Sequence, residues 1–100
     1  MGRFRLSTLA REDLAGIHRY IATENESAAD RLIERLFGAF LLLAENPGIG
    51  QARSDLRPEL RTLTNGNYVV LFYPIRNGVE IAGIIHGARD VEALFRTGER

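Results

Sequence analysis

The chain has 100 residues, 45% of them hydrophobic, and its 13 basic residues balance 13 acidic residues, so the formal net charge is +0. This length supports one hydrophobic core and excludes two ordinary domains, so we expect a single domain over residues 1–100. Proteins that grip nucleic acid usually carry a basic excess, so the neutral charge argues against direct binding of nucleic acid.

Cysteine is absent and there are 2 histidines. Disulfides and thiolate metal sites are therefore excluded, and two histidines alone make a poor ligand set, so we expect neither a metal nor a cofactor. No run approaches the roughly 18 apolar residues that a membrane-spanning helix requires, and the first residues do not resemble a signal peptide. We expect a cytoplasmic protein with no membrane partner.

The first residues predict a short strand followed by a helix. Phe4 and Leu6 alternate with arginines, which indicates a strand over residues 3–6. Ser7 then offers an N-cap for a helix over about residues 8–23. The apolar face of this helix is made by residues that recur at intervals of three and four, namely Ala10, Leu14, Ile17 and Ile21.

A second helix should follow, capped by Asn25 or Ser27 and ending before Pro47. The two helices, joined by a short turn, should form an antiparallel hairpin. Leu41 and Leu42 extend beyond the main apolar stripe of the second helix, and they either pack against the first helix and the sheet or form a site for a partner. The main stripe consists of Ala29, Leu32, Ile33, Leu36, Phe37, Phe40 and Leu43.

The second half of the chain predicts strands. We expect them over residues 60–64, over residues 68–73 and from residue 79 onward, separated by turns that contain glycine. Residues 68–73 are apolar on both faces, which is typical of a central strand. Either a short C-terminal helix, expected over residues 90–95, or a bound partner chain would cover the second face. Residues 96–100 are polar and should fray.

Helices that precede a run of strands indicate an α+β fold. We predict an N-terminal strand, an antiparallel helix hairpin packed on a small, mainly antiparallel sheet, and a short C-terminal helix.

Polar residues gather after the last strand. His86 either makes structural hydrogen bonds or acts as an acid or base, while Arg89 and Asp90 form an ion pair, cap the final helix or contact a target. Arg61 either binds a partner carboxylate or is solvated. Tyr20 is expected at the edge of the core.

One ordered set of residues extends over roughly residues 4–94. Its members are Ala10, Asp13, Leu14, Ile17, Tyr20, Ile21, Leu43, Pro47, Gly50, Arg61, Tyr68, Val69, Val70, Tyr73 and residues 84–90. In this set the chain resembles the ParE/RelE superfamily and is most similar to ParE-type toxins of type II toxin–antitoxin systems. The resemblance implies a RelE/ParE-like fold and a small toxin that a ParD-like antitoxin wraps and neutralises in a hetero-oligomer.

The resemblance leaves two activities open. ParE-like members inhibit DNA gyrase by protein contact, whereas RelE-like members are ribosome-dependent mRNA endoribonucleases that need no metal. We favour gyrase inhibition, because the chain has no lysine, no tyrosine after Tyr73 and no basic excess. The nuclease alternative would use Glu59, Arg61, His86 and Arg89 as acid, base and charge-stabilising groups. A third possibility is an inert module that only binds its antitoxin.

The residues that we assign to each partner follow from these expectations. We predict that the antitoxin contacts Leu41, Leu42, Arg61 and Tyr73. We predict that the target contacts His86, Arg89 and Asp90, and no residue is predicted to bind a metal.

Overall fold

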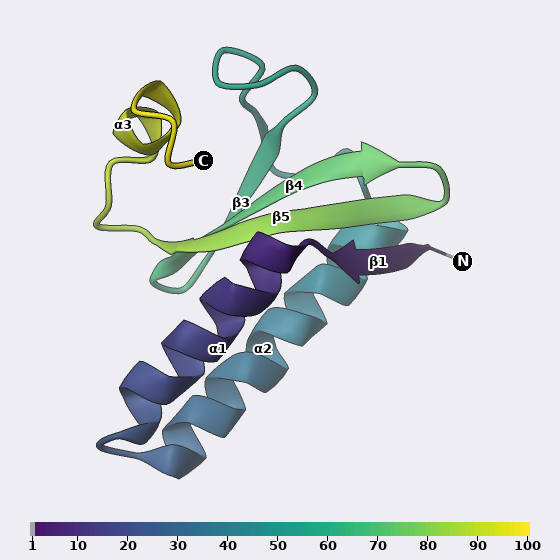
Figure 1. The fold of residues 1–100 in the computed structure, drawn as a ribbon. Helices are drawn as coiled ribbons and strands as arrows, with labels where there is room; N and C mark the ends of the chain where they lie inside the picture. Colours follow the sequence, from purple (N-terminus) through teal and green to yellow (C-terminus); the bar gives the residue numbers. More distant parts are fainter. Residues whose placement is uncertain (1) are drawn as a thin grey trace.

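A helix hairpin packs against one face of a sheet in the computed structural model, which describes residues 2–100 (Figure 1). The predicted α+β class is confirmed, with an N-terminal strand, a helix hairpin, a mainly antiparallel sheet and a short C-terminal helix. In chain order the elements are β1 (Arg3–Leu6), α1 (Thr8–Ala22), α2 (Glu26–Glu45), β2 (Gln51–Ala52), β3 (Arg61–Asn65), β4 (Tyr68–Ile75), β5 (Gly78–His86) and α3 (Val91–Arg96).

The sheet has five strands in the order β1-β5-β4-β3-β2, with β4 in the centre as predicted. β1 is parallel to β5, and the other neighbours are antiparallel. β1 pairs with only the first part of β5, from Gly78 to Ile81. A bulge then adds one residue, Ala82, to β5 opposite β4, and a bulge of this kind bends the strand and changes the direction in which its later groups point.

The ends of the helices follow their capping residues. The side chain of Ser7 accepts a hydrogen bond from the first turn of α1. Asn25, rather than Ser27, caps α2 in the same way, and Asp90 caps α3. Each cap satisfies a backbone N–H group that has no partner within the helix.

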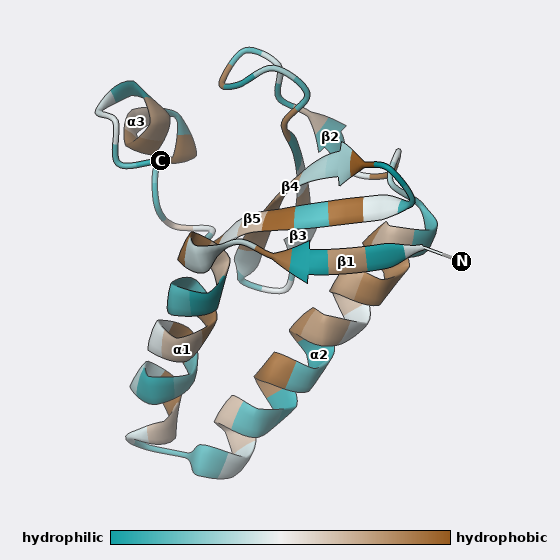
Figure 2. Cartoon of the chain, turned by 45° about the vertical axis from the view of Figure 1, so that its right-hand side comes forward, coloured by the Kyte–Doolittle hydropathy of each residue, from teal (hydrophilic) through white to brown (hydrophobic). Residues whose placement is uncertain are grey.

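The main core lies between the helix hairpin and the sheet, where the hydrophobic bands of the helices face the strands (Figure 2). Burial of apolar surface is the main favourable contribution to folding, at roughly 25 cal/mol per Å². The fully buried members of the main core include Leu36, Phe40, Leu43, Val70, Phe72, Val79 and Ile81.

A second, smaller core lies on the other face of the sheet. Leu71 and Ile85 point away from the hairpin and pack with Leu60 and with Leu94 of α3. Alternate residues of β4 therefore serve different cores, as the two apolar faces of this strand predicted. Figure 1 shows α3 and the segment before β3 on the side of the sheet that the helix hairpin does not cover.

Three local expectations were wrong. β2 was not predicted, and β3 begins at Arg61 rather than one residue earlier, because Leu60 turns into the second core. Tyr20 is 80% exposed and does not lie at the core edge.

The end of the chain also differs from expectation. Residues 97–100, which we expected to fray, are attached to the rest of the chain: Arg100 forms an ion pair with Asp13 of α1 at 2.7 Å and its backbone N–H donates to Leu94.

Candidate functional site

Two neighbouring leucines near the end of α2 are exposed to solvent. Leu41 is 58% exposed and Leu42 is 52% exposed, although the helix buries much of its other apolar surface. The alternative in which they pack inside the chain is therefore wrong. We call these two side chains the leucine surface, and its use by a partner stays a prediction.

Arg61 holds the segment that follows α2. Its guanidinium donates to the carbonyl oxygens of Gly48 at 2.6 Å, Ile49 at 3.2 Å and Gly50 at 3.2 Å. Three bonds from one charged group fix this turn, so Arg61 is not the freely solvated side chain that one alternative described. An antitoxin carboxylate that bound Arg61 would have to share it with these carbonyls. Tyr73 is half-buried against the second core.

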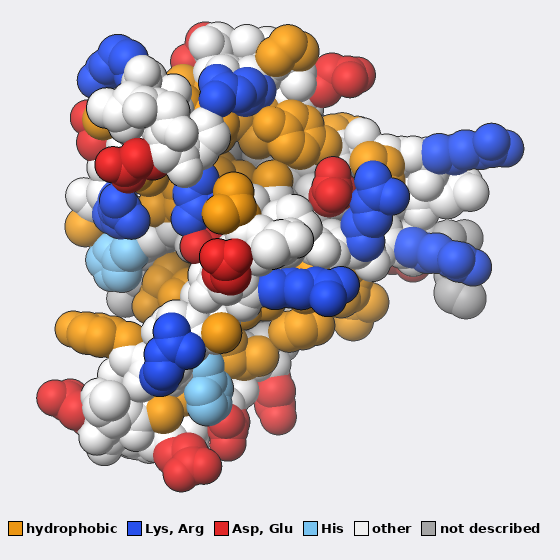
Figure 3. All heavy atoms as spheres, in the orientation of Figure 1, with side chains coloured by type: hydrophobic (Ala, Val, Ile, Leu, Met, Phe, Trp, Pro, Cys, Tyr) orange, Lys and Arg blue, Asp and Glu red, His pale blue; other side chains and the backbone are white. Residues whose placement is uncertain are grey.

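A groove of about 550 Å³ lies between α1 and the end of β5. We call it the α1–β5 groove, and the residues used below to describe it are Asp13, Tyr20, Tyr68, His86, Arg89 and Arg100. Hydrophobic side chains are visible on this part of the surface between the two histidines at the lower left of Figure 3. The groove combines aromatic surface with charged groups at its edge.

His86 and Tyr68 form one end of this groove. Their rings meet edge to face with centroids 5.3 Å apart. Nδ1 of His86 accepts a hydrogen bond from the N–H of Ala88 at 3.0 Å, which places the proton of the neutral imidazole on Nε2. His86 therefore has the predicted structural hydrogen bond and also presents an N–H donor.

Arg89 and Asp90, which we expected to pair or to cap a helix, have different partners. Asp90 caps α3, as one alternative predicted. Arg89 lies 3.6 Å from Glu99, and both of these side chains are more than half exposed. An exposed ion pair of this kind contributes little stability, so Arg89 can exchange Glu99 for a carboxylate of a partner at small cost.

The residues of the nuclease alternative are divided between two places. Arg61 is opposite Phe72 of β4, whereas His86 is opposite Tyr68, four positions along the same strand. At ~3.3 Å per residue this separation is roughly 13 Å along the sheet. Glu59 lies beside Arg61, and Arg89 lies beside the α1–β5 groove with His86. The described residues therefore do not form one acid–base site from this set.

One group of charges links the second core to the loop before β3. Arg53 binds both Asp55 at 3.0 Å and Glu92 of α3 at 3.1 Å. The hydrogen bond from Arg53 lowers the pKa of the Asp55 carboxyl, and the same bond raises the pKa of Arg53. Arg57 adds a contact over the ring of Phe95, with its guanidinium carbon 4.9 Å from the ring centroid. These contacts fasten α3 to the loop.

Within residues 2–100, no helix is long and apolar enough to cross a membrane. The same described residues contain no group of three or more His, Cys, Asp or Glu side chains that could hold a metal ion.

Solved structures with this fold include a chain of the "Chromosomal ParDE TA system from P. aeruginosa", with a TM-score of 0.71 at 20% sequence identity. The match covers 86% of the present chain and 96% of that chain. The chain is thus a small α+β protein that shares the fold of that structure.

Sequence comparison identifies the family. The family model described as ParE toxin of type II toxin-antitoxin system, parDE, matches residues 4–91. Toxin ParE1 of Caulobacter vibrioides is 36% identical over 95 residues, which cover 93% of the present chain and 97% of that protein. The chain therefore belongs to the ParE toxin family of type II toxin–antitoxin systems, and the expected resemblance is confirmed.

Proposed function

We propose that this ParE-family toxin inhibits DNA gyrase by protein–protein contact and is neutralised by a ParD-like antitoxin. Membership of the parDE toxin family is the observation that carries the proposal. The division of the nuclease residues supports the choice, because Arg61 lies opposite Phe72 and His86 opposite Tyr68, four positions apart along β4. The proposal implies a cytoplasmic protein, because gyrase acts on cytoplasmic DNA, and a single functional domain.

The leucine surface supports an antitoxin contact. Leu41 and Leu42 are large apolar side chains exposed on one helix, and burying them against a partner is favourable. Arg61 holds the turn directly after α2 and therefore supports the end of this surface. Tyr73, which packs against the second core on the other face of the sheet, would be a separate part of the antitoxin contact. An antitoxin segment that becomes ordered on binding would need to bury on the order of 1,000–3,000 Å² in total.

The α1–β5 groove supports a separate target contact. His86 and Arg89 are exposed at its edge, and Asp90 begins the adjoining helix. In Figure 1 the end of β5 and the end of α2 lie on opposite sides of the molecule. An antitoxin on the leucine surface and gyrase on the groove would therefore use different residues.

A gyrase supercoiling assay and a cell-free translation assay, run with the purified chain, test this function. We expect supercoiling to be inhibited while translation continues, and the cognate antitoxin to restore supercoiling. If the chain arrests translation and leaves supercoiling intact, and if His86→Ala and Arg61→Ala both abolish that arrest, the activity is instead that of a ribonuclease. A chain that affects neither process but binds its antitoxin tightly would be the inert module.

A further inference from the structure

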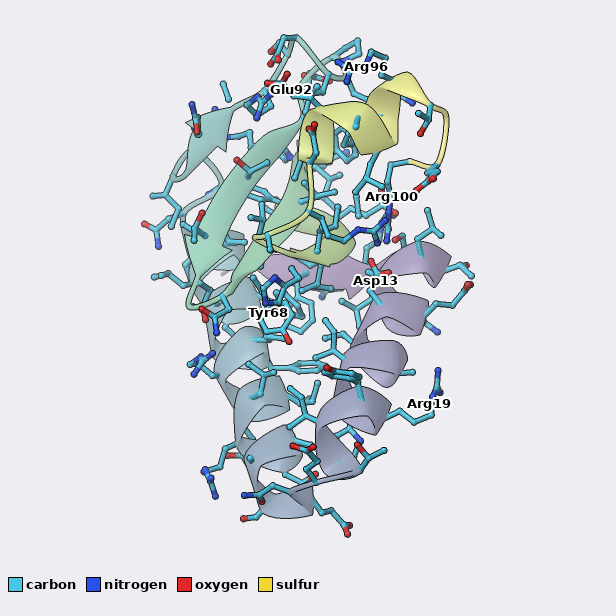
Figure 4. All side chains as sticks on the ribbon, turned by 90° about the vertical axis from the view of Figure 1, so that its left-hand side faces the viewer. Asp13, Arg19, Tyr68, Glu92, Arg96 and Arg100 are labelled. Carbon is cyan, nitrogen blue, oxygen red and sulfur yellow. The ribbon has the colours of Figure 1, made fainter. Side chains whose placement is uncertain are left out.

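The ion pair between Asp13 and Arg100 differs from every other ion pair within residues 2–100. Asp13 is 15% exposed and Arg100 is 13% exposed, whereas each other pair has at least one partner that is 60% exposed or more. The two residues are 87 positions apart in the chain and are joined at 2.7 Å. Figure 4 shows Arg100 reaching from the C-terminal segment toward Asp13 on α1.

Asp13 is itself held by the sheet. Because β1 stops pairing at Ile81, no strand of the described chain lies beside the later residues of β5 on that side. The N–H of Ile84 instead donates to Oδ2 of Asp13 at 3.0 Å, so the carboxylate replaces the missing strand as acceptor. Oδ1 is left for Arg100. The position of the carboxylate is therefore fixed by β5 as well as by α1.

The sheet also leaves room for the guanidinium. A Cβ atom added at Gly83 would lie 2.8 Å from Nη1 of Arg100 and 3.2 Å from Oδ2 of Asp13. Nη1 itself is buried without a hydrogen-bond partner. Burying a charged donor without an acceptor costs free energy, so this pair is not arranged for stability alone.

Arg100 in turn fixes the short segment before it. Its carbonyl oxygen accepts a hydrogen bond from Arg57 at 2.6 Å, and the N–H groups of Glu99 and Arg100 both donate to the carbonyl of Leu94. Glu99 is thereby held 3.6 Å from Arg89. The segment that contains Glu99 and Arg100 thus places Arg100 in the wall of the α1–β5 groove and Glu99 beside Arg89.

We propose that Asp13 and Arg100 are positioning residues: their ion pair fastens residues 97–100 to α1 and so holds the α1–β5 groove in the shape that binds the target. This inference rests on the proposed function, in which gyrase contacts the groove. Asp13 and Arg100 act through the shape of the groove, which both residues line. The leucine surface on α2 does not depend on this ion pair.

The test compares Arg100→Met with Arg96→Met in the full chain. Both variants remove one positive charge from the end of the chain, but Arg96 is exposed and points away from Asp13 (Figure 4). We expect Arg100→Met to raise the concentration for half-maximal inhibition of gyrase supercoiling at least tenfold and to change antitoxin affinity less than threefold. Arg96→Met should change neither. Amide hydrogen exchange of residues 97–100 should become faster only in Arg100→Met.

Two further variants separate positioning from folding. Arg100→Lys keeps a cation beside Asp13 and should restore inhibition to within about threefold of the wild type, since the ion pair is retained. Asp13→Asn keeps an acceptor for Ile84 and removes only the charge, so it replaces Arg100→Met as the test if that variant does not fold.

The outcomes are distinguishable. A wild-type chain that leaves gyrase active overturns the proposed function and this role with it. A wild type that inhibits, together with an Arg100→Met or Asp13→Asn variant that is folded and inhibits equally well, overturns the positioning role alone. Equal losses of gyrase inhibition and antitoxin affinity would also overturn it, because a general structural defect affects both.

Discussion

At Gly78 the sheet leaves no room for a side chain. It lies at the start of β5 with φ of +156°, directly opposite Arg3 of the parallel strand β1. A Cβ atom there would overlap the carbonyl group of Arg3. Glycine is therefore required by the close approach of two backbones as well as by the backbone angle. Gly38 in α2 differs from Gly78 because a Cβ atom added there would meet nothing within 4 Å.

We expect Gly78→Ala to lower the free energy of unfolding by about 2–4 kcal/mol, because β1 must shift to avoid the new methyl group. Gly38→Ala should raise it by about 0.5–1 kcal/mol, because alanine favours the helix interior. Urea titrations of the two variants and the wild type measure both effects. A Gly78→Ala variant as stable as the wild type would contradict the close approach of β1 and β5.

At the scale of the element, α2 carries both buried residues that stabilise the fold and exposed residues that are free to bind a partner. Leu43 is fully buried, whereas the two residues before it form the leucine surface. Adjacent positions differ in this way because successive side chains of a helix point about 100° apart, as 3.6 residues per turn requires.

Substitution of the leucine surface should therefore affect binding and leave folding intact. We expect Leu41→Gln and Leu42→Gln to change the free energy of unfolding by less than about 0.5 kcal/mol and to raise the Kd for the antitoxin at least tenfold. Leu43→Ala should instead lower the free energy of unfolding by about 2–5 kcal/mol. Calorimetric titration and thermal melts give the two readouts. Unchanged affinity in both glutamine variants would remove this surface from the antitoxin contact.

Ion pairs of Arg53 join α3 to the loop that precedes β3. Arg53 lowers the pKa of Asp55 in the folded chain below its ordinary value of 3.8. A carboxyl with a lowered folded pKa stabilises the fold above its unfolded pKa, and this contribution is lost as the pH falls through the lowered value. The effect is small because Asp55 is exposed to solvent.

Asp55→Asn should therefore lessen the loss of stability in acid. Between about pH 5 and pH 3, the melting temperature of the wild type should fall more steeply than that of the variant, and the two should differ by a constant amount above pH 5. Thermal melts across this range measure the slopes. Parallel curves throughout would show that the contact between Arg53 and Asp55 is absent in solution.

Most elements could be predicted because their signals are local. Capping residues, helical intervals and glycine turns predicted both long helices and the hairpin of β4 and β5 within a few residues. β2 could not be predicted, because Gln51 and Ala52 carry no strand pattern and their pairing with β3 is a contact between segments about ten residues apart, next to the turn that Arg61 holds.

The sites could be predicted only in part. The exposed polar residues after β5 were found because they follow a strong strand pattern. The anchoring of the chain end was missed, because Asp13 and Arg100 are 87 residues apart and neither has a local signal. The separation of Arg61 from His86 likewise depends on the register of the sheet.

At the scale of the whole molecule, the two cores share the same strands. Leu71 and Phe72 are neighbours in β4, yet one is buried in the second core and the other in the main core. Loss of β4 would therefore expose both cores at once. Because the two cores share strands, we expect them to unfold together as one cooperative unit.

We expect unfolding in urea to show one transition, with the same midpoint by far-ultraviolet circular dichroism and by tyrosine fluorescence. Tyr73 packs on the second core and Tyr68 on the main core, so the fluorescence reports on both. A second transition at lower urea would show that α3 and its loop unfold separately. Such a result would contradict the single domain that we expect.

The position of β1 also determines when the fold can be completed during synthesis. Ser7 bonds to Ala82, which is 75 residues later in the chain, and β1 has its sheet partner only in β5. During synthesis, at ~5–20 residues per second, the first strand must wait several seconds before the ribosome has made the strand that receives it. Until then Phe4 and the helix hairpin lack most of the sheet that buries them. The newly made toxin is therefore incomplete for nearly the whole of its translation, and an antitoxin already present in the cell can meet it before the fold is complete.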